Sequence, residues 1–93
     1  MLKASDKATP DSDVIVTELD GEAVLLNLDT KLYFSLNATG VRIWKLLAEG
    51  LTLGDISERL YEEYDVTPEK AQQCVLELVG QLNDEKLVTL TRD

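Results

Sequence analysis

The chain has 93 residues, enough for one small domain, and 44% of them are hydrophobic, which is typical of a folded domain. It has no histidine and a single cysteine, Cys74, so neither a structural zinc site nor an internal disulfide can form. The 18 acidic and 9 basic residues give a net charge of −9, which disfavours binding to nucleic acid and to anionic membranes.

The N-terminal segment, residues 1–13, is polar and has no apolar stretch of the kind found in a secretory signal. We therefore expect a mobile tail over these residues and a cytoplasmic protein. Residues 14–91 are expected to form a single ordered domain. No apolar run approaches the roughly 18 residues that a membrane-spanning helix needs.

Three short strands are predicted after the tail. Residues 14–18 are mostly β-branched, and the pair Asp20 and Gly21 then predicts a type I′ hairpin into a second strand over 23–28. Another short turn leads to a third strand over 31–36. Connections this short imply an antiparallel meander, which leaves the strand over 31–36 at one edge of the sheet.

The hydrophobic period then becomes helical, and three helices are predicted over 38–49, 53–64 and 68–84. A residue that can cap a helix N-terminus precedes each of them: Asn37, Thr52 and Thr67. A short strand over 87–90 closes the chain. The predicted fold class is α+β, a winged helix-turn-helix-like arrangement of a three-stranded antiparallel sheet followed by three helices and a short C-terminal strand.

The helix over 68–84 has more apolar positions than one core stripe requires. A helical wheel predicts a core stripe of Ala71, Cys74, Val75, Leu78 and Leu82. A second, mixed surface then contains Gln72, Leu76, Val79 and Asn83, with Val75 at its floor. This surface is either a scatter of exposed apolar residues or one wall of a hydrophobic groove.

The edge strand offers the opposite wall. Its candidate binding residues are Lys31, Leu32, Tyr33, Phe34 and Ser35. An unpaired edge is a liability for a protein unless it is covered, charged or used. An extended peptide could pair with its free backbone groups and place side chains against the helix over 68–84.

Two other classes of function fit the sequence less well. The helix-turn-helix order suggests DNA binding, but residues 52–65 contain one arginine against five acidic residues. No nucleophile and base pair can be assembled without histidine, so we expect no catalytic residues, no metal site, no cofactor and no enzymatic activity.

Residues 25–64 resemble the PqqD-like family, whose members are also called precursor recognition elements of ribosomally synthesised and post-translationally modified peptides (RiPPs). The family pattern L-N-x-T-G-x-x-I-W-x-L-L-x-x-G is matched by Leu36, Asn37, Thr39, Gly40, Ile43, Trp44, Leu46, Leu47 and Gly50. The resemblance implies three strands packed on three helices.

The resemblance also implies a partner and a mode of binding. Such domains bind the leader segment of a precursor peptide and present it to a modifying enzyme, which is a leader peptidase, a cyclase or a radical SAM protein. The leader would lie beside the strand over 31–35 and against the helix over 68–84. Its contacts on that helix would be Gln72, Val75, Leu76, Val79 and Asn83.

The pathway is suggested by one departure from the family pattern. Leu25, Leu26 and Asn27 stand where proteins of pyrroloquinoline quinone biosynthesis tend to have a Tyr-Pro pair. The chain looks more like the separate recognition proteins of lasso-peptide clusters. The alternatives are a peptide chaperone of quinone biosynthesis and a general protein–protein adaptor that docks through Glu62 and Glu63.

Overall fold

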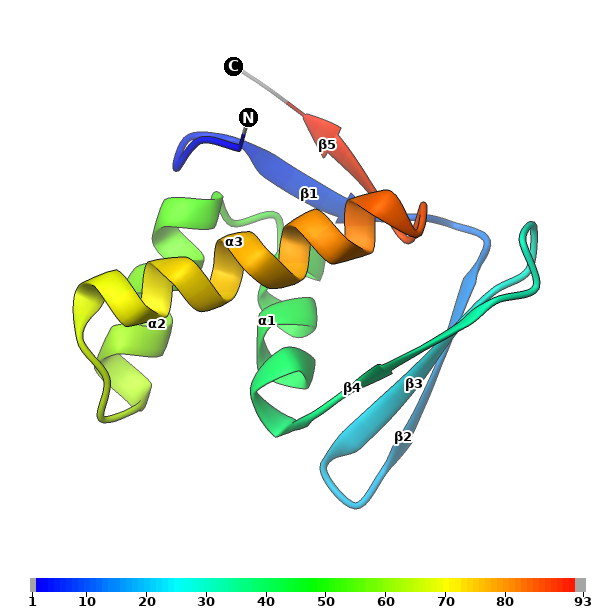
Figure 1. Cartoon of the computed structure of the whole chain (residues 1–93), viewed down its shortest axis with the longest axis horizontal. Coiled ribbons are helices and arrows are strands. Elements are labelled where there is room, and N and C mark those ends of the chain that lie inside the picture. Colours follow the sequence, from blue (N-terminus) through cyan, green and yellow to red (C-terminus); the bar gives the residue numbers. More distant parts are fainter. Residues whose placement is uncertain (1, 92–93) are drawn as a thin grey trace.

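The computed structural model, which describes residues 2–91, has three helices and two separate antiparallel sheets (Figure 1). In chain order the elements are β1 (Lys7–Pro10), β2 (Val14–Leu19), β3 (Glu22–Asn27), β4 (Tyr33–Leu36), α1 (Ala38–Ala48), α2 (Leu53–Glu63), α3 (Pro68–Asp84) and β5 (Val88–Thr91). The predicted α+β class is confirmed, and so is the order of its sheet, helices and final strand.

The three-stranded sheet has the order β2-β3-β4, so the predicted edge position of the third strand is confirmed. Asp20 and Gly21 both have positive φ, at 52° and 82°, as a type I′ hairpin requires. The edge strand begins at Tyr33, two residues later than predicted, because Lys31 has a φ of 65° and belongs to the turn.

The expectation of a mobile tail over residues 1–13 is wrong for the residues that the structure describes. Strand β1 pairs in antiparallel register with β5, and its Ala8 is buried. Asp6 is also buried, with a carboxylate that accepts a hydrogen bond from the Lys3 backbone N–H at 2.9 Å. The Asp6 carbonyl accepts another from the Leu53 N–H at 2.9 Å, which ties this segment to α2.

Local capping chemistry begins the three helices where the sequence predicts. The side chains of Asn37, Thr52 and Thr67 each accept a hydrogen bond from the backbone N–H three residues later, at 2.8, 3.2 and 3.2 Å. Gly50, just beyond α1, has a φ of 86°, the left-handed conformation that suits a helix end. Within residues 2–91, no helix combines the length and apolar character needed to cross a bilayer.

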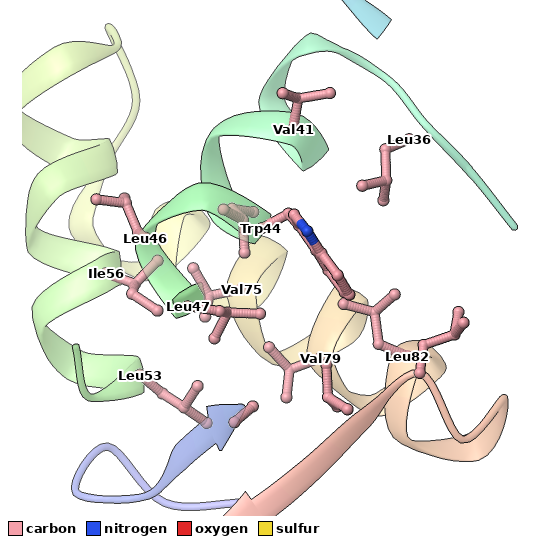
Figure 2. Packing of buried hydrophobic residues seen from close by; sticks show 14 of the residues in the cluster. Leu36, Val41, Trp44, Leu46, Leu47, Leu53, Ile56, Val75, Val79 and Leu82 are labelled. Atoms are coloured by element: carbon pink, nitrogen blue, oxygen red, sulfur yellow. The ribbon is translucent and has the colours of Figure 1, made fainter. Parts of the chain in front are cut away.

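The hydrophobic core lies between the three helices, one face of the three-stranded sheet and the β1–β5 pair. Trp44 is 7% exposed and projects from α1 towards the C-terminal half of α3 (Figure 2). Leu46 of α1 and Ile56 of α2 lie together on the other side of that cluster. The core therefore fixes α3 against the rest of the molecule along most of its length.

Candidate functional site

The outer edge of β4 carries unpaired backbone groups whose positions follow from the ladder. The Asn27 N–H donates to the Leu32 carbonyl at 3.0 Å, which sets the phase of the β3–β4 pairing. Bonded and non-bonded pairs alternate in an antiparallel ladder, so the N–H and C=O of Phe34 point towards β3. Those of Tyr33 and Ser35 point away from the sheet.

The other side of β3 gives the same phase independently. The Leu28 N–H donates to the Asp13 carbonyl at 2.9 Å, so the even-numbered residues of β3 bond towards β2 and the odd-numbered residues towards β4. No backbone hydrogen bond outside the ladder uses the groups of Tyr33 or Ser35 within residues 2–91. The edge therefore presents two N–H and two C=O groups to an incoming chain.

A hollow of about 360 Å³ lies beside this edge, and we call it the β4–α3 groove. It is lined by Phe34, Ser35, Leu36, Asn37, Thr39, Gly40, Ile43, Cys74, Glu77, Leu78 and Gln81. One wall is the edge strand together with the start of α1, into which β4 leads, and the other is one flank of α3 (Figure 1). The predicted combination of edge strand and last helix is present, with different helix residues.

The helix contributes a flank that sequence reasoning assigned to the core. The residues of α3 that are fully buried are Ala71, Val75, Val79 and Leu82. Cys74 and Leu78 are only half-buried and face the groove. The prediction that Val79 lies on a spare surface is wrong, because it is 0% exposed, as is Val75. Helix α3 packs against both α2 and β5, and Val79 belongs to the core face that it turns towards them.

Gln72 and Leu76 lie on the opposite flank of α3, in a second hollow of about 570 Å³ that we call the α2–α3 pocket. Its lining is Ala4, Leu53, Gly54, Ser57, Glu58, Tyr61, Glu62, Pro68, Gln72 and Leu76. The N-terminal segment closes one side, where the Gly54 N–H donates to the Ala4 carbonyl at 2.9 Å.

The remaining predicted site residues are all exposed. Tyr33 is 71% exposed on the edge strand, and Leu32 is 55% exposed in the turn before it. Lys31 lies in the same turn, and Asn83 is near the end of α3. None of these four residues lines the β4–α3 groove.

A buried amide connects the turn before β4 to the turn after α3. Asn27 is 3% exposed, and its Nδ2 donates to the Lys86 carbonyl at 3.0 Å. Its Oδ1 accepts from the N–H groups of Asp29 and Thr30, at 2.9 and 3.2 Å. The amide thus joins the β3–β4 turn to the α3–β5 turn. The signal in the sequence was a polar residue at an inward position of an apolar strand face.

An ion pair joins the end of α2 to α1. Arg42 donates from Nε and Nη2 to the two carboxylate oxygens of Glu63, at 2.8 and 2.6 Å. The hydrogen bond from Arg42 lowers the pKa of Glu63, and the same bond raises the pKa of Arg42. Of the two predicted docking acids, Glu63 is therefore engaged within the protein, whereas Glu62 lines the α2–α3 pocket.

The groups that line the β4–α3 groove are suited to binding another chain. Free main-chain groups can pair with an extended chain, and the half-buried Phe34 and Leu78 give apolar contact. Glu77 and Gln81 add a charged and a polar group. Within residues 2–91, no group of three or more His, Cys, Asp or Glu residues could hold a metal ion.

Comparisons with known proteins agree on one family. Residues 22–88 match the sequence model of a family described as coenzyme PQQ synthesis protein D (PqqD). The solved structure of "TbiB1 in Complex with the TbiA(beta) Leader Peptide" is 32% identical, with a TM-score of 0.83, over 91% of this chain and 99% of that one. "Lasso peptide synthetase B1 complexed with the leader peptide" is 25% identical, with a TM-score of 0.81, over 89% and 98%. A comparison with curated protein sequences found no match.

Proposed function

Because the chain belongs to the PqqD family, we propose that it binds the leader segment of a ribosomally synthesised precursor peptide in the β4–α3 groove. The observation that carries this proposal is the free edge of β4, whose unpaired groups on Tyr33 and Ser35 lie beside an apolar flank of α3. The bound leader is presented to a modifying enzyme. The chain itself acts as an adaptor, with no catalytic step of its own.

The leader adds to the sheet as a fourth strand beside β4. Its main chain pairs with the N–H and C=O groups of Tyr33 and Ser35, which gives affinity that depends little on sequence. Alternate side chains of a strand point to opposite faces, so every second leader residue faces the groove. Apolar leader residues at those positions would contact Phe34 and Leu78.

Lasso-peptide biosynthesis is the pathway that we propose. Both solved structures reported above contain a leader peptide, and one of them is described as a lasso peptide synthetase component. A role as a peptide chaperone in pyrroloquinoline quinone biosynthesis is the second candidate, favoured by the description of the matching family. The two candidates differ in the precursor that the groove accepts.

The test is a titration of fluorescent leader peptides from a lasso precursor and from the quinone precursor, followed by fluorescence polarisation. An adaptor needs a Kd of about 1 μM or lower, which corresponds to about −8 kcal/mol. Leu78→Asp places a charge in the groove and should weaken leader binding at least about tenfold, or about 1.4 kcal/mol.

Leu76→Asp is the matched control, because Leu76 is similarly half-buried on the same helix but faces the α2–α3 pocket. It should leave leader affinity within about twofold of the original value, a difference of well under 1 kcal/mol. Circular dichroism checks that both variants are folded. Failure of both leaders to bind the unaltered chain would contradict the proposal, as would equal losses in the two variants.

A further inference from the structure

The α2–α3 pocket combines an apolar floor with an acidic rim. Leu53 and Leu76 form part of the floor, and Tyr61 stands at the side with 47% of its surface exposed. Glu58 and Glu62 are exposed residues of α2 at the edge of the pocket, and no basic residue lines it. Exposed tyrosine beside an apolar hollow is typical of surfaces that bind other proteins.

The two rim carboxylates are free to meet a partner. The ion pairs within residues 2–91 are Arg42–Glu63 and Lys45–Glu18, so neither Glu58 nor Glu62 is paired inside the protein. Neither side chain takes part in a hydrogen bond with another described residue. A cation brought to this rim would add an interaction without breaking one.

The walls of the pocket select the kind of partner. The backbone groups of α2 and α3 are bonded within their helices or to the helix caps, and the Leu53 and Gly54 N–H groups are bonded to Asp6 and Ala4, so an extended peptide finds no strand edge to pair with here. A nucleic acid and a second copy of this chain are both disfavoured, because each would bring negative charge to a protein of net charge −9. Recognition must instead pass through side chains that are apolar and basic.

We infer that the α2–α3 pocket is the docking site for the modifying enzyme, which inserts an apolar side chain flanked by Lys or Arg from a basic, amphipathic segment. This inference rests on the proposed function, since only an adaptor needs a second partner. Because the pocket and the β4–α3 groove lie on opposite flanks of α3, leader and enzyme can be held at the same time. Helix α3 would then be the element that both partners contact.

The experiment follows leader removal by a purified leader peptidase from a lasso-peptide pathway, as the concentration of the chain is raised. The test variant is the double charge reversal Glu58→Lys/Glu62→Lys. Its matched control is Asp84→Lys/Glu85→Lys, which makes the same change in charge at exposed residues near the end of α3. Positive charge at a helix C-terminus is favourable, so the control should stay folded.

The test variant should need at least about ten times more protein for half-maximal processing, and the control less than about twice more. Leader affinity, measured separately by polarisation, should be unchanged in both variants. Processing that is unaffected in a folded test variant would overturn the inference, and so would an equal loss in the control. If the unaltered chain did not bind the leader at all, the proposed function would be overturned instead.

Amide chemical shifts can distinguish the enzyme from other possible occupants of the α2–α3 pocket. Titration of the labelled chain with the peptidase should move the signals of Gly54, Ser57 and Gln72, while leader peptide should move those of Ser35 and Gly40. Shifts confined to the outer sheet face would overturn the inference. Sedimentation that reveals a dimer dependent on Glu58 and Glu62 would also overturn it, because the occupant would then be a second copy.

Discussion

The two flanks of α3 border hollows that differ in what they can recognise. On one side, Leu78 faces the free edge of β4, where backbone N–H and C=O groups are unpaired. On the other side, Leu76 faces α2, whose backbone groups are bonded within the helix or, at Leu53 and Gly54, to the N-terminal segment. The first hollow can therefore recognise the extended conformation of a peptide, whereas the second can recognise only side chains.

This difference explains how one small domain can keep two partners apart. Main-chain pairing tolerates many sequences and suits an extended leader peptide. Side-chain recognition through an apolar floor and an acidic rim suits a single folded enzyme surface. The fully buried ridge of α3, which includes Val75 and Val79, separates the two hollows.

The largest effect on stability should come from placing a charge on the buried face of α3. Val79→Asp places a carboxylate where the side chain is 0% exposed, and an unpaired buried charge costs several kcal/mol. Because the whole domain is stabilised by only about 5–15 kcal/mol, the variant should be largely unfolded. Circular dichroism and urea denaturation would measure this loss. A folded Val79→Asp protein that still bound the enzyme but not the leader would show that Val79 belongs to the groove and not to the core.

A smaller, selective effect should come from proline on the edge strand. Ser35→Pro removes an N–H that points out of the sheet, so the β3–β4 ladder remains while pairing with the leader is lost. We expect leader binding to weaken at least about tenfold, equivalent to about 1.4 kcal/mol, with little change in the urea midpoint.

Phe34→Pro is the paired control, because the Phe34 N–H bonds inward to β3. It should lower stability as well as binding, since proline removes a ladder hydrogen bond there. If the two prolines had the same effect on stability, the phase of the edge strand deduced from Asn27 would be incorrect.

The smallest effect concerns the ion pair that holds α2, and with it the α2–α3 pocket. Arg42 lowers the pKa of Glu63 below its usual value of 4.5 by hydrogen bonding to the carboxylate. The pair therefore stabilises the fold above the unfolded-state pKa, and this contribution is lost as the pH falls through the folded-state pKa.

Glu63→Gln should accordingly lower the urea midpoint slightly near neutral pH, and the difference from the unaltered chain should vanish in acid. Urea denaturation at several values between about pH 7 and about pH 2 would measure it. The pair is partly exposed, so salt should reduce the difference. A difference that grew as the pH fell would contradict the assigned direction of the pKa shift.

Features set by a few neighbouring residues were predictable from the sequence. The hairpin at Asp20 and Gly21 and the caps at Asn37, Thr52 and Thr67 follow from local turn and capping chemistry. The edge position of β4 follows from connection length alone. Each of these depends on residues that are close together in the chain.

Features set by packing between distant segments were not predictable. A helical wheel identifies two flanks beside a core stripe, but it contains nothing that says which flank faces the sheet. Gln72 and Leu76 were therefore assigned to the groove that Cys74 and Leu78 line. Strand β1 is not predicted because it has four residues and one buried side chain, Ala8. A segment this short shows no alternation of hydrophobic and polar residues that would identify a strand.

The pairing of β1 with β5 has a consequence for how this fold can be combined with others. Lys7 and Thr91 are partners in register, so the start of β1 and the end of β5 lie one strand spacing apart, about 5 Å. A domain with adjacent ends can be inserted into a surface loop of a host protein without stretching it. By the same geometry, a linker from Thr91 to the segment before β1 should permit a circular permutant opened at the β2–β3 turn, with residues 2–6 kept because they are bonded to α2.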